Sequence, residues 1–250
     1  MSGHSKWSKI KHRKGADDVK RGNLFTKLTR EIIVAAREGG GSTDTNFRLR
    51  LAVQKARDGN MPMDNIDRAI KKGTGDLGGG SLVEITLEGY GPNGMAILVN
   101  ALSDNRNRTI QEVRSVFTRH GGSLGESGCV SWLFESKGVI NIRAEGIDAD
   151  ELALAAIDAG AEDVKVENGY VEVYTVPDQL EKVRQALEKN DVEIESSELV
   201  MEPKSLIKLD DKAGLQALKL LDRLEEVDDV QNVYSNADIP DAVMESYQAA

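Results

Sequence analysis

The first residues of the chain carry closely spaced cations together with two aromatic rings, Trp7 and His12. Lysine and arginine along an extended segment or helix can reach successive phosphates, and each neutralised phosphate releases condensed counterions. Trp7 and His12 could stack on an exposed base, or Trp7 could anchor this segment to the helices that follow. The cations expected to contact nucleic acid are Lys6, Lys9, Lys11, Arg13, Lys14, Lys20, Arg21 and Lys27.

The charge of the chain is divided between its two ends. Residues 1–75 hold 17 Lys and Arg against 8 Asp and Glu, a balance of +9, whereas the remaining residues hold 15 against 34, a balance of −19. The net charge of −10 conceals this division. An asymmetry of this size favours binding to a polyanion over the alternative, an ordinary solvated basic surface.

A second pair of cations, Arg106 and Arg108, lies between a predicted strand and the N-terminus of a predicted helix. Arginine side chains and backbone N–H groups at such a position suit phosphate or carboxylate, so both residues are candidates for nucleic-acid binding. The alternative is a capped turn whose arginines pair with an acidic domain further along the chain. The sequence leaves the two interpretations open.

No residues stand at spacings typical of catalysis, a metal or a cofactor. The chain has three histidines, none at H-E-x-x-H spacing, and one cysteine, Cys129, which is expected to be a small buried thiol within an apolar strand. His120 ends a predicted helix, where a cation is favourable whatever the function. Residues 73–78 spell G-x-G-x-x-G, but they follow a helix and precede a strand, the reverse of a dinucleotide fold. We therefore expect no enzyme activity, no cofactor and no metal.

The periodicity of the N-terminal part predicts helices. Apolar residues at three- and four-residue intervals predict an amphipathic helix over 17–38. Asp44 or Thr45 is expected to cap a second helix, and Pro62 suits the first turn of a third. Together these helices predict a basic helical domain over 1–77.

Beyond residues 73–81, which are predicted to form a flexible linker, the period changes to that of strands. Strands are predicted over 82–88, 95–101 and 129–134, with a helix over 109–119. A strand near 230–234 and the helix before it have too few partners of their own. They are therefore expected to complete this middle domain.

Residues 137–202 follow the order βαββαβ of the ferredoxin-like split unit, with an Asn-Gly turn at 168–169. Residues 136–203 hold 6 Lys and Arg against 17 Asp and Glu, a balance of −11. An RNA recognition motif needs aromatic residues on its first and third strands, and here only the third, with Tyr170 and Tyr174, has them. A protein-contact or dimer surface is the better expectation.

The predicted fold class is therefore α+β, with a helical domain, a discontinuous α/β domain and an inserted ferredoxin-like domain. The boundaries are 1–77 for the helical domain, 78–135 with 204–250 for the discontinuous domain, and 136–203 for the insertion.

Several motifs resemble the YebC/PmpR family, which includes mitochondrial translational activators of cytochrome c oxidase. They are G-H-S-K-W at 3–7 with I-K-H-R-K at 10–14, N-M-P at 60–62, E-G-Y-G-P at 88–92, D-N-R-N-R-T at 104–109, and the glycine stretch 121–128 that runs into Trp132 and Phe134. The match is dense over the first 135 residues. The resemblance implies three domains with the last one inserted. It also implies DNA-binding transcriptional regulation, as described for bacterial members, or a role in translation, as for mitochondrial members.

The expected function is that of a non-enzymatic, nucleic-acid-binding regulator of gene expression, most simply a DNA-binding transcriptional regulator. The alternative is a ribosome-associated translation factor that binds rRNA through the same basic surface. For base readout, the third helix offers Asn65, Arg68, Lys71 and Lys72. No apolar run reaches the roughly 20 residues that span a bilayer, so the chain is expected in the cytoplasm without a membrane partner. Self-association stays open.

Overall fold

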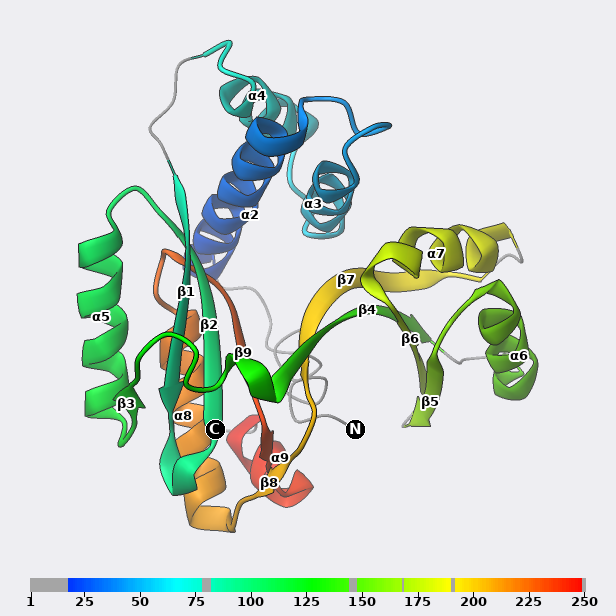
Figure 1. Ribbon diagram of the computed structural model, residues 1–250. Coiled ribbons are helices and arrows are strands. Elements are labelled where there is room, and N and C mark those ends of the chain that lie inside the picture. Colours follow the sequence, from blue (N-terminus) through cyan, green and yellow to red (C-terminus); the bar gives the residue numbers. More distant parts are fainter. Residues whose placement is uncertain (1–17, 78–81, 144–147, 168, 190–191, 249–250) are drawn as a thin grey trace. The chain divides into compact units, whose positions relative to one another are not determined.

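A computed structural model describes residues 18–77, 82–143, 148–167, 169–189 and 192–248 (Figure 1). The fold is mixed α+β, as the sequence predicts. The chain divides into two compact units, here called the first unit (Met1–Phe134 with Pro203–Ala250) and the second unit (Glu135–Glu202). The helical and middle parts share the first unit, and their separation into two domains stays a prediction.

Three helices, α2 (Asp18–Gly39), α3 (Phe47–Asp58) and α4 (Met63–Gly73), lie within residues 18–77 (Figure 1). Their apolar faces meet in one core, in which Ile32, Leu49 and Ile66 are fully buried. The helix α4 approaches α2 closely at Gly73, where an added Cβ atom would lie 2.5 Å from the carbonyl oxygen of Ile33. Glycine is therefore required there by space.

The cap of α3 differs from the sequence-based prediction, which placed it at Asp44 or Thr45. The cap is Asn46, whose side-chain oxygen accepts the N–H of Leu49 at 3.0 Å. Its amide nitrogen donates to the carbonyl of Ala35 at 2.7 Å and to a second carbonyl just beyond the end of α2. An aspartate could not donate these bonds, so a buried amide joins α2 to α3.

The first unit also contains a four-stranded sheet in the order β3-β1-β2-β9. Its strands are β1 (Val83–Tyr90), β2 (Ala96–Ser103), β3 (Ser123–Leu124) and β9 (Val230–Ser235), and all pairs are antiparallel. The helices α5 (Arg106–Arg119) and α8 (Asp211–Glu225) contribute Phe117 and Leu218 to the core of this sheet. Strand β9, from the C-terminal part of the chain, supplies the neighbour that β2 would otherwise lack.

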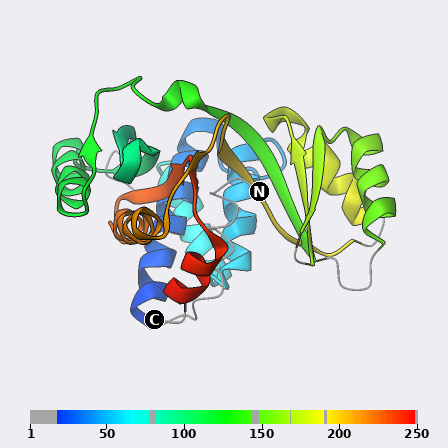
Figure 2. The ribbon, with the colours of Figure 1, turned by 90° about the horizontal axis from the view of Figure 1, so that it is seen from below.

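Several short elements were not expected from the sequence, among them β3, β10 (Ala237–Asp238) and α9 (Asp241–Gln248). Strand β10 pairs in parallel with β8 (Ile207–Lys208). Figure 2 shows α9, in red, beside α8, in orange. Among the described residues, every helix is too short or too polar to cross a membrane.

The strand predicted over 129–134 is wrong. Residues Ser131–Leu133 form a 3-10 turn, and β4 (Phe134–Arg143) begins only at Phe134. The cause is the side chain of Glu88, which accepts backbone N–H groups that a strand would offer to a neighbour. Local apolar content therefore did not decide the structure of this segment.

The second unit has the order βαββαβ, with a sheet in the order β5-β6-β4-β7, the ferredoxin-like arrangement. Gly169 has φ of +79°, in the left-handed region that a tight hairpin requires. After β4 its elements are α6 (Ala149–Ala159), β5 (Asp163–Glu167), β6 (Tyr170–Thr175), α7 (Leu180–Lys189) and β7 (Ile194–Pro203).

Candidate nucleic-acid interface

Most of the cations expected to bind nucleic acid belong to the N-terminal segment. Seven of the residues expected to bind lie outside the described residues: Lys6, Trp7, Lys9, Lys11, His12, Arg13 and Lys14. Lys20 and Arg21 lie in the first turns of α2, where the backbone alone is described. Binding through these residues stays a prediction.

Further along α2, the cations make contacts within the first unit. The ammonium of Lys27 donates to the carbonyl oxygen of Glu225 at 2.5 Å, at the end of α8. Arg30 donates to the carbonyl oxygen of Asp228 at 2.6 Å and pairs with the carboxylate of Asp229 at 2.9 Å. In this structure both side chains join α2 to the region between α8 and β9, so Lys27 is poorly placed for phosphate.

Asp229 is the centre of this contact and is only 2% exposed. One of its oxygens accepts from the hydroxyls of Ser103 (2.9 Å) and Thr109 (2.6 Å) and from the guanidinium of Arg108 (2.9 Å). Burial by itself would raise the pKa of Asp229, but hydrogen bonds from Thr109, Arg108 and Ser103 and the charge of Arg30 lower it below its usual value. The carboxylate is therefore charged, and four side chains compensate that charge through hydrogen bonds and ion pairs.

The two arginines of α5 are consequently unlike each other. Arg108 reaches both Asp229 and Asp104, the latter at 2.8 Å, and both carboxylates belong to the first unit. The pairing with the acidic inserted domain, considered from the sequence, is therefore not the one that Arg108 makes. Arg106 is exposed in the turn that Asn105 caps, and its contact with nucleic acid stays a prediction.

The helix α4 presents a different arrangement, a polar surface that we call the α4 basic face: Asn65, Arg68, Lys71 and Lys72. All four residues are exposed. Spacings of three and four residues place them on one side of the helix, away from the buried Ile66 and Ala69. The exposed Asp64 and Asp67 lie on the same side, each four residues before one of the cations. This face brings three cations and an amide together on a rigid element.

The expected set of binding residues did not include the α4 basic face, although the third helix was noted for base readout. The signal lies in the amphipathic pattern of 63–73, which buries Ile66 and Ala69 and leaves the cations outside. The charge balance of the sequence, by contrast, indicates the N-terminal segment.

Cys129 lies in a loop, not within a strand as predicted, and it is half-buried. Burial raises the pKa of its thiol, and the nearby charge of Glu88 raises it further. A neutral thiol is a weak nucleophile, so this cysteine has the wrong electrostatics for covalent catalysis.

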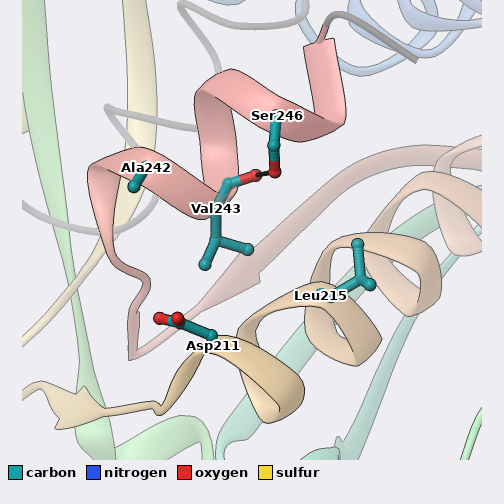
Figure 3. A pocket seen from close by; sticks show the side chains of 5 residues that line it. All are labelled: Asp211, Leu215, Ala242, Val243 and Ser246. Carbon is teal, nitrogen blue, oxygen red and sulfur yellow. Dashed lines mark hydrogen bonds between the residues drawn. The ribbon is translucent and has the colours of Figure 1, made fainter.

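A hollow between α8 and α9 is lined by Asp211, Leu215, Ala242, Val243 and Ser246 (Figure 3). The hydroxyl of Ser246 donates to the carbonyl oxygen of Val243 at 2.9 Å, within its own helix. Asp211 is the one ionisable residue of this lining, so the hollow has no acid–base pair. Among the described residues, no group of three His, Cys, Asp or Glu side chains is placed to hold a metal ion.

Comparisons with known proteins agree along the whole chain. Residues 5–76 match the family model described as the TACO1/YebC protein N-terminal domain, and residues 82–237 match the TACO1/YebC second and third domain. A probable transcriptional regulatory protein of Dehalococcoides mccartyi strain 195 is 61% identical over 249 residues, covering 100% of this chain and 99% of its own length.

A second relative with the same description, from Natranaerobius thermophilus, is 53% identical and covers 98% of this chain and 100% of its own. The crystal structure of a conserved hypothetical protein from Aquifex aeolicus has a TM-score of 0.85 at 50% identity. That likeness covers 94% of this chain and 97% of the other.

Proposed function

The chain belongs to the TACO1/YebC family, and we propose that it regulates gene expression by binding nucleic acid through its cationic helical region. The relatives described as probable transcriptional regulatory proteins support the regulatory role. The α4 basic face is the observation that carries the binding part of the proposal. It holds Arg68, Lys71 and Lys72 exposed on one side of a helix, whereas Arg30 and Arg108 are engaged with Asp229.

Duplex DNA is the first candidate partner. An α-helix fits the major groove, where arginine and asparagine read guanine and adenine edges. Asn65 and Arg68 are three residues apart on the exposed side of α4, and Lys71 and Lys72 follow within one turn. In the proposed arrangement the first two residues face base edges, while the lysines contact phosphate and the N-terminal cations add further phosphate contacts.

rRNA is the second candidate, because the charge of the chain is so unevenly distributed. Residues 135–202, the second unit, hold 6 Lys and Arg against 18 Asp and Glu, a balance of −12. A molecule with one cationic part and one strongly anionic part can place the former among rRNA phosphates with the latter turned away. Base-specific readout is unnecessary in that arrangement.

Two measurements on the full chain distinguish these partners. The first compares affinity for a promoter duplex with affinity for a random duplex, and the second locates the protein in a sucrose gradient of lysate at moderate salt. A preference of about three orders of magnitude for the promoter supports sequence-specific DNA binding. Equal affinities together with co-sedimentation with ribosomes would overturn it in favour of rRNA.

The contribution of the N-terminal segment is tested by changing Lys9, Lys11, Arg13 and Lys14 together to alanine. The slope of log affinity against log salt should become shallower, by about 0.9 for each phosphate of duplex DNA that the variant no longer neutralises. An unchanged slope would show that this segment does not contact phosphate.

A further inference from the structure

The loop before β4 exposes a large aromatic ring that has no role in the proposed function. The side chain of Trp132 is 65% exposed, more than most of the large apolar side chains among the described residues. Single exposed apolar residues are common and need no explanation. The way in which this ring is held is what distinguishes it.

On its N-terminal side, the loop is fixed by the carboxylate of Glu88, which is only 5% exposed. One oxygen of Glu88 accepts the N–H of Gly128 and the other accepts those of Val130 and Ser131, each at 2.7 Å. Burial by itself would raise the pKa of Glu88, but these backbone hydrogen bonds lower it below its usual value. A charged, buried side chain therefore fixes the residues directly before Trp132.

On its C-terminal side, the carbonyl of Leu133 accepts the N–H of Lys204 at 2.8 Å. The ring itself is also held, because its Nε1 donates to the carbonyl oxygen of Cys129 at 3.1 Å. The hydroxyl of Tyr90 donates to the same oxygen at 3.0 Å, and Tyr90 is itself 38% exposed. Backbone and ring are thus both fixed before a ligand binds. Binding should therefore cost little further conformational entropy of the side chain.

This geometry limits what the site can recognise. The N–H of Trp132 and the O–H of Tyr90 both donate within the protein, so the site offers ring faces and neither of these two donors to a ligand. A ligand must then be recognised by stacking, which suits any nucleobase because every base has a π-face. Bases inside a duplex already stack on each other, so an accessible base must be unpaired.

We propose that Trp132, with Tyr90 beside it, is a stacking site for an unpaired base of single-stranded nucleic acid. The inference rests on the proposed function in one respect, namely that the partner is nucleic acid. Lys204, exposed and hydrogen-bonded through its backbone to the residue after Trp132, would face the phosphate of the stacked nucleotide. Because the loop also carries the exposed Glu126, whose charge would repel a phosphate, stacking rather than charge should supply the binding energy at this site.

Tryptophan fluorescence tests this directly. The chain has two tryptophans, so in a Trp7→Phe variant all tryptophan emission comes from Trp132. The probes are a single-stranded oligonucleotide of about ten nucleotides, within the range of single-strand binding sites, and an abasic strand of equal length. The oligonucleotide should quench the emission, and the abasic strand should leave it nearly unchanged. Equal quenching by the two strands, or none by either, would overturn the proposal; none by either would also suggest a protein partner for the ring.

Substitutions supply the second arm. Trp132→Ala should weaken binding of the single strand about 5- to 150-fold, the range expected for one stacked base. Trp132→Phe should retain most of the affinity, and Leu154→Ala, at an exposed leucine of α6, should have no effect. Wild-type affinity in Trp132→Ala, with a native unfolding midpoint, would reject the stacking site.

The salt dependence separates this inference from the proposed function. Trp132→Ala should leave the slope of log affinity against log salt unchanged, because the variant still neutralises the same phosphates. If the wild-type chain binds no nucleic acid at all, the proposed function fails together with the inference. If it binds with a normal slope and Trp132→Ala binds equally well, only the stacking site fails.

Discussion

The arginines that meet at Asp229 and the cations of the α4 basic face differ in their partners more than in their sequence surroundings. Arg30 and Arg108 contact a carboxylate that is 2% exposed. The cations of α4 are exposed on the outer side of a helix whose inner side is apolar. Both groups count equally among the cations of the sequence.

The difference teaches that a cation count overestimates the binding surface. A buried carboxylate must be paired, because leaving it uncompensated costs several kcal/mol. Asp229 therefore takes up two arginines that would otherwise count toward nucleic-acid binding. Exposed cations on a rigid helix keep their charge available to a partner.

The largest expected effect is the loss of stability when the buried carboxylate of Asp229 is removed. Asp229→Ala leaves Arg30 without its carboxylate and the buried Ser103 hydroxyl without its acceptor. The free energy of unfolding, measured with urea, should fall by about 3 kcal/mol. Asp104→Ala is the matched control, since Asp104 also contacts Arg108 but is exposed, and it should cost less than about 1 kcal/mol. Equal costs would show that burial is not what makes Asp229 important.

The next effect concerns the other buried carboxylate, Glu88. Glu88→Gln replaces one acceptor oxygen with a donor that faces backbone N–H groups, so the loop before Trp132 should be held less firmly. A decrease of about 2 kcal/mol is expected in the same urea titration. Glu84→Gln, at an exposed position of the same strand, should change stability much less. A stable Glu88→Gln variant would indicate that the loop is held by other contacts.

A smaller effect tests the α4 basic face. Changing Arg68, Lys71 and Lys72 together to alanine should weaken binding to duplex DNA about tenfold at low salt and reduce the salt slope by about 0.9 for each phosphate no longer neutralised. Each substitution should change stability by less than about 0.5 kcal/mol, because the side chains are exposed. The control is Lys182→Ala with Lys189→Ala on α7, which should leave affinity unchanged. If both variants bind alike, the α4 basic face is not the interface.

The smallest effect is a pH dependence. The pKa of Asp229 is lowered in the folded state, so its contribution to stability is fully present above the unfolded value of about 3.9 and is lost as the pH falls through the lower folded pKa. Asp229→Asn removes this titration. The unfolding free energy of the wild type should therefore fall more steeply below about pH 4 than that of the variant. Parallel curves would contradict the lowered pKa.

Much of the fold follows from periodicity in the sequence. The apolar spacing over 17–38 predicts the C-terminal end of α2 to within a residue, and the alternating runs around the Asn-Gly turn predict the βαββαβ order of the second unit. These elements depend on neighbours in sequence. Their side chains also repeat regularly enough to show which face is buried.

The failures at Cys129 and Arg108 have one physical cause, a side chain that acts at a distance along the chain. Glu88 accepts N–H groups from residues about 40 positions away and converts an apolar stretch from strand to turn. Arg108 meets a carboxylate 121 residues further on. Nothing in the local pattern at Cys129 or Arg108 reports such a partner, so neither the turn nor the engaged arginine could be predicted.

The hydrogen bond between Leu133 and Lys204 has a consequence for how the chain can be divided. The chain leaves the first unit after Leu133 and re-enters it next to the same residue, at Lys204. The second unit, here called the cassette, is therefore an insertion between two adjacent points of the first unit. Because the entropy of closing a loop grows only with the logarithm of its length, a short turn in place of the cassette should still allow β9 to reach β2. Proteolytic cleavage within the cassette should, for the same reason, leave two fragments that remain associated through the shared sheet.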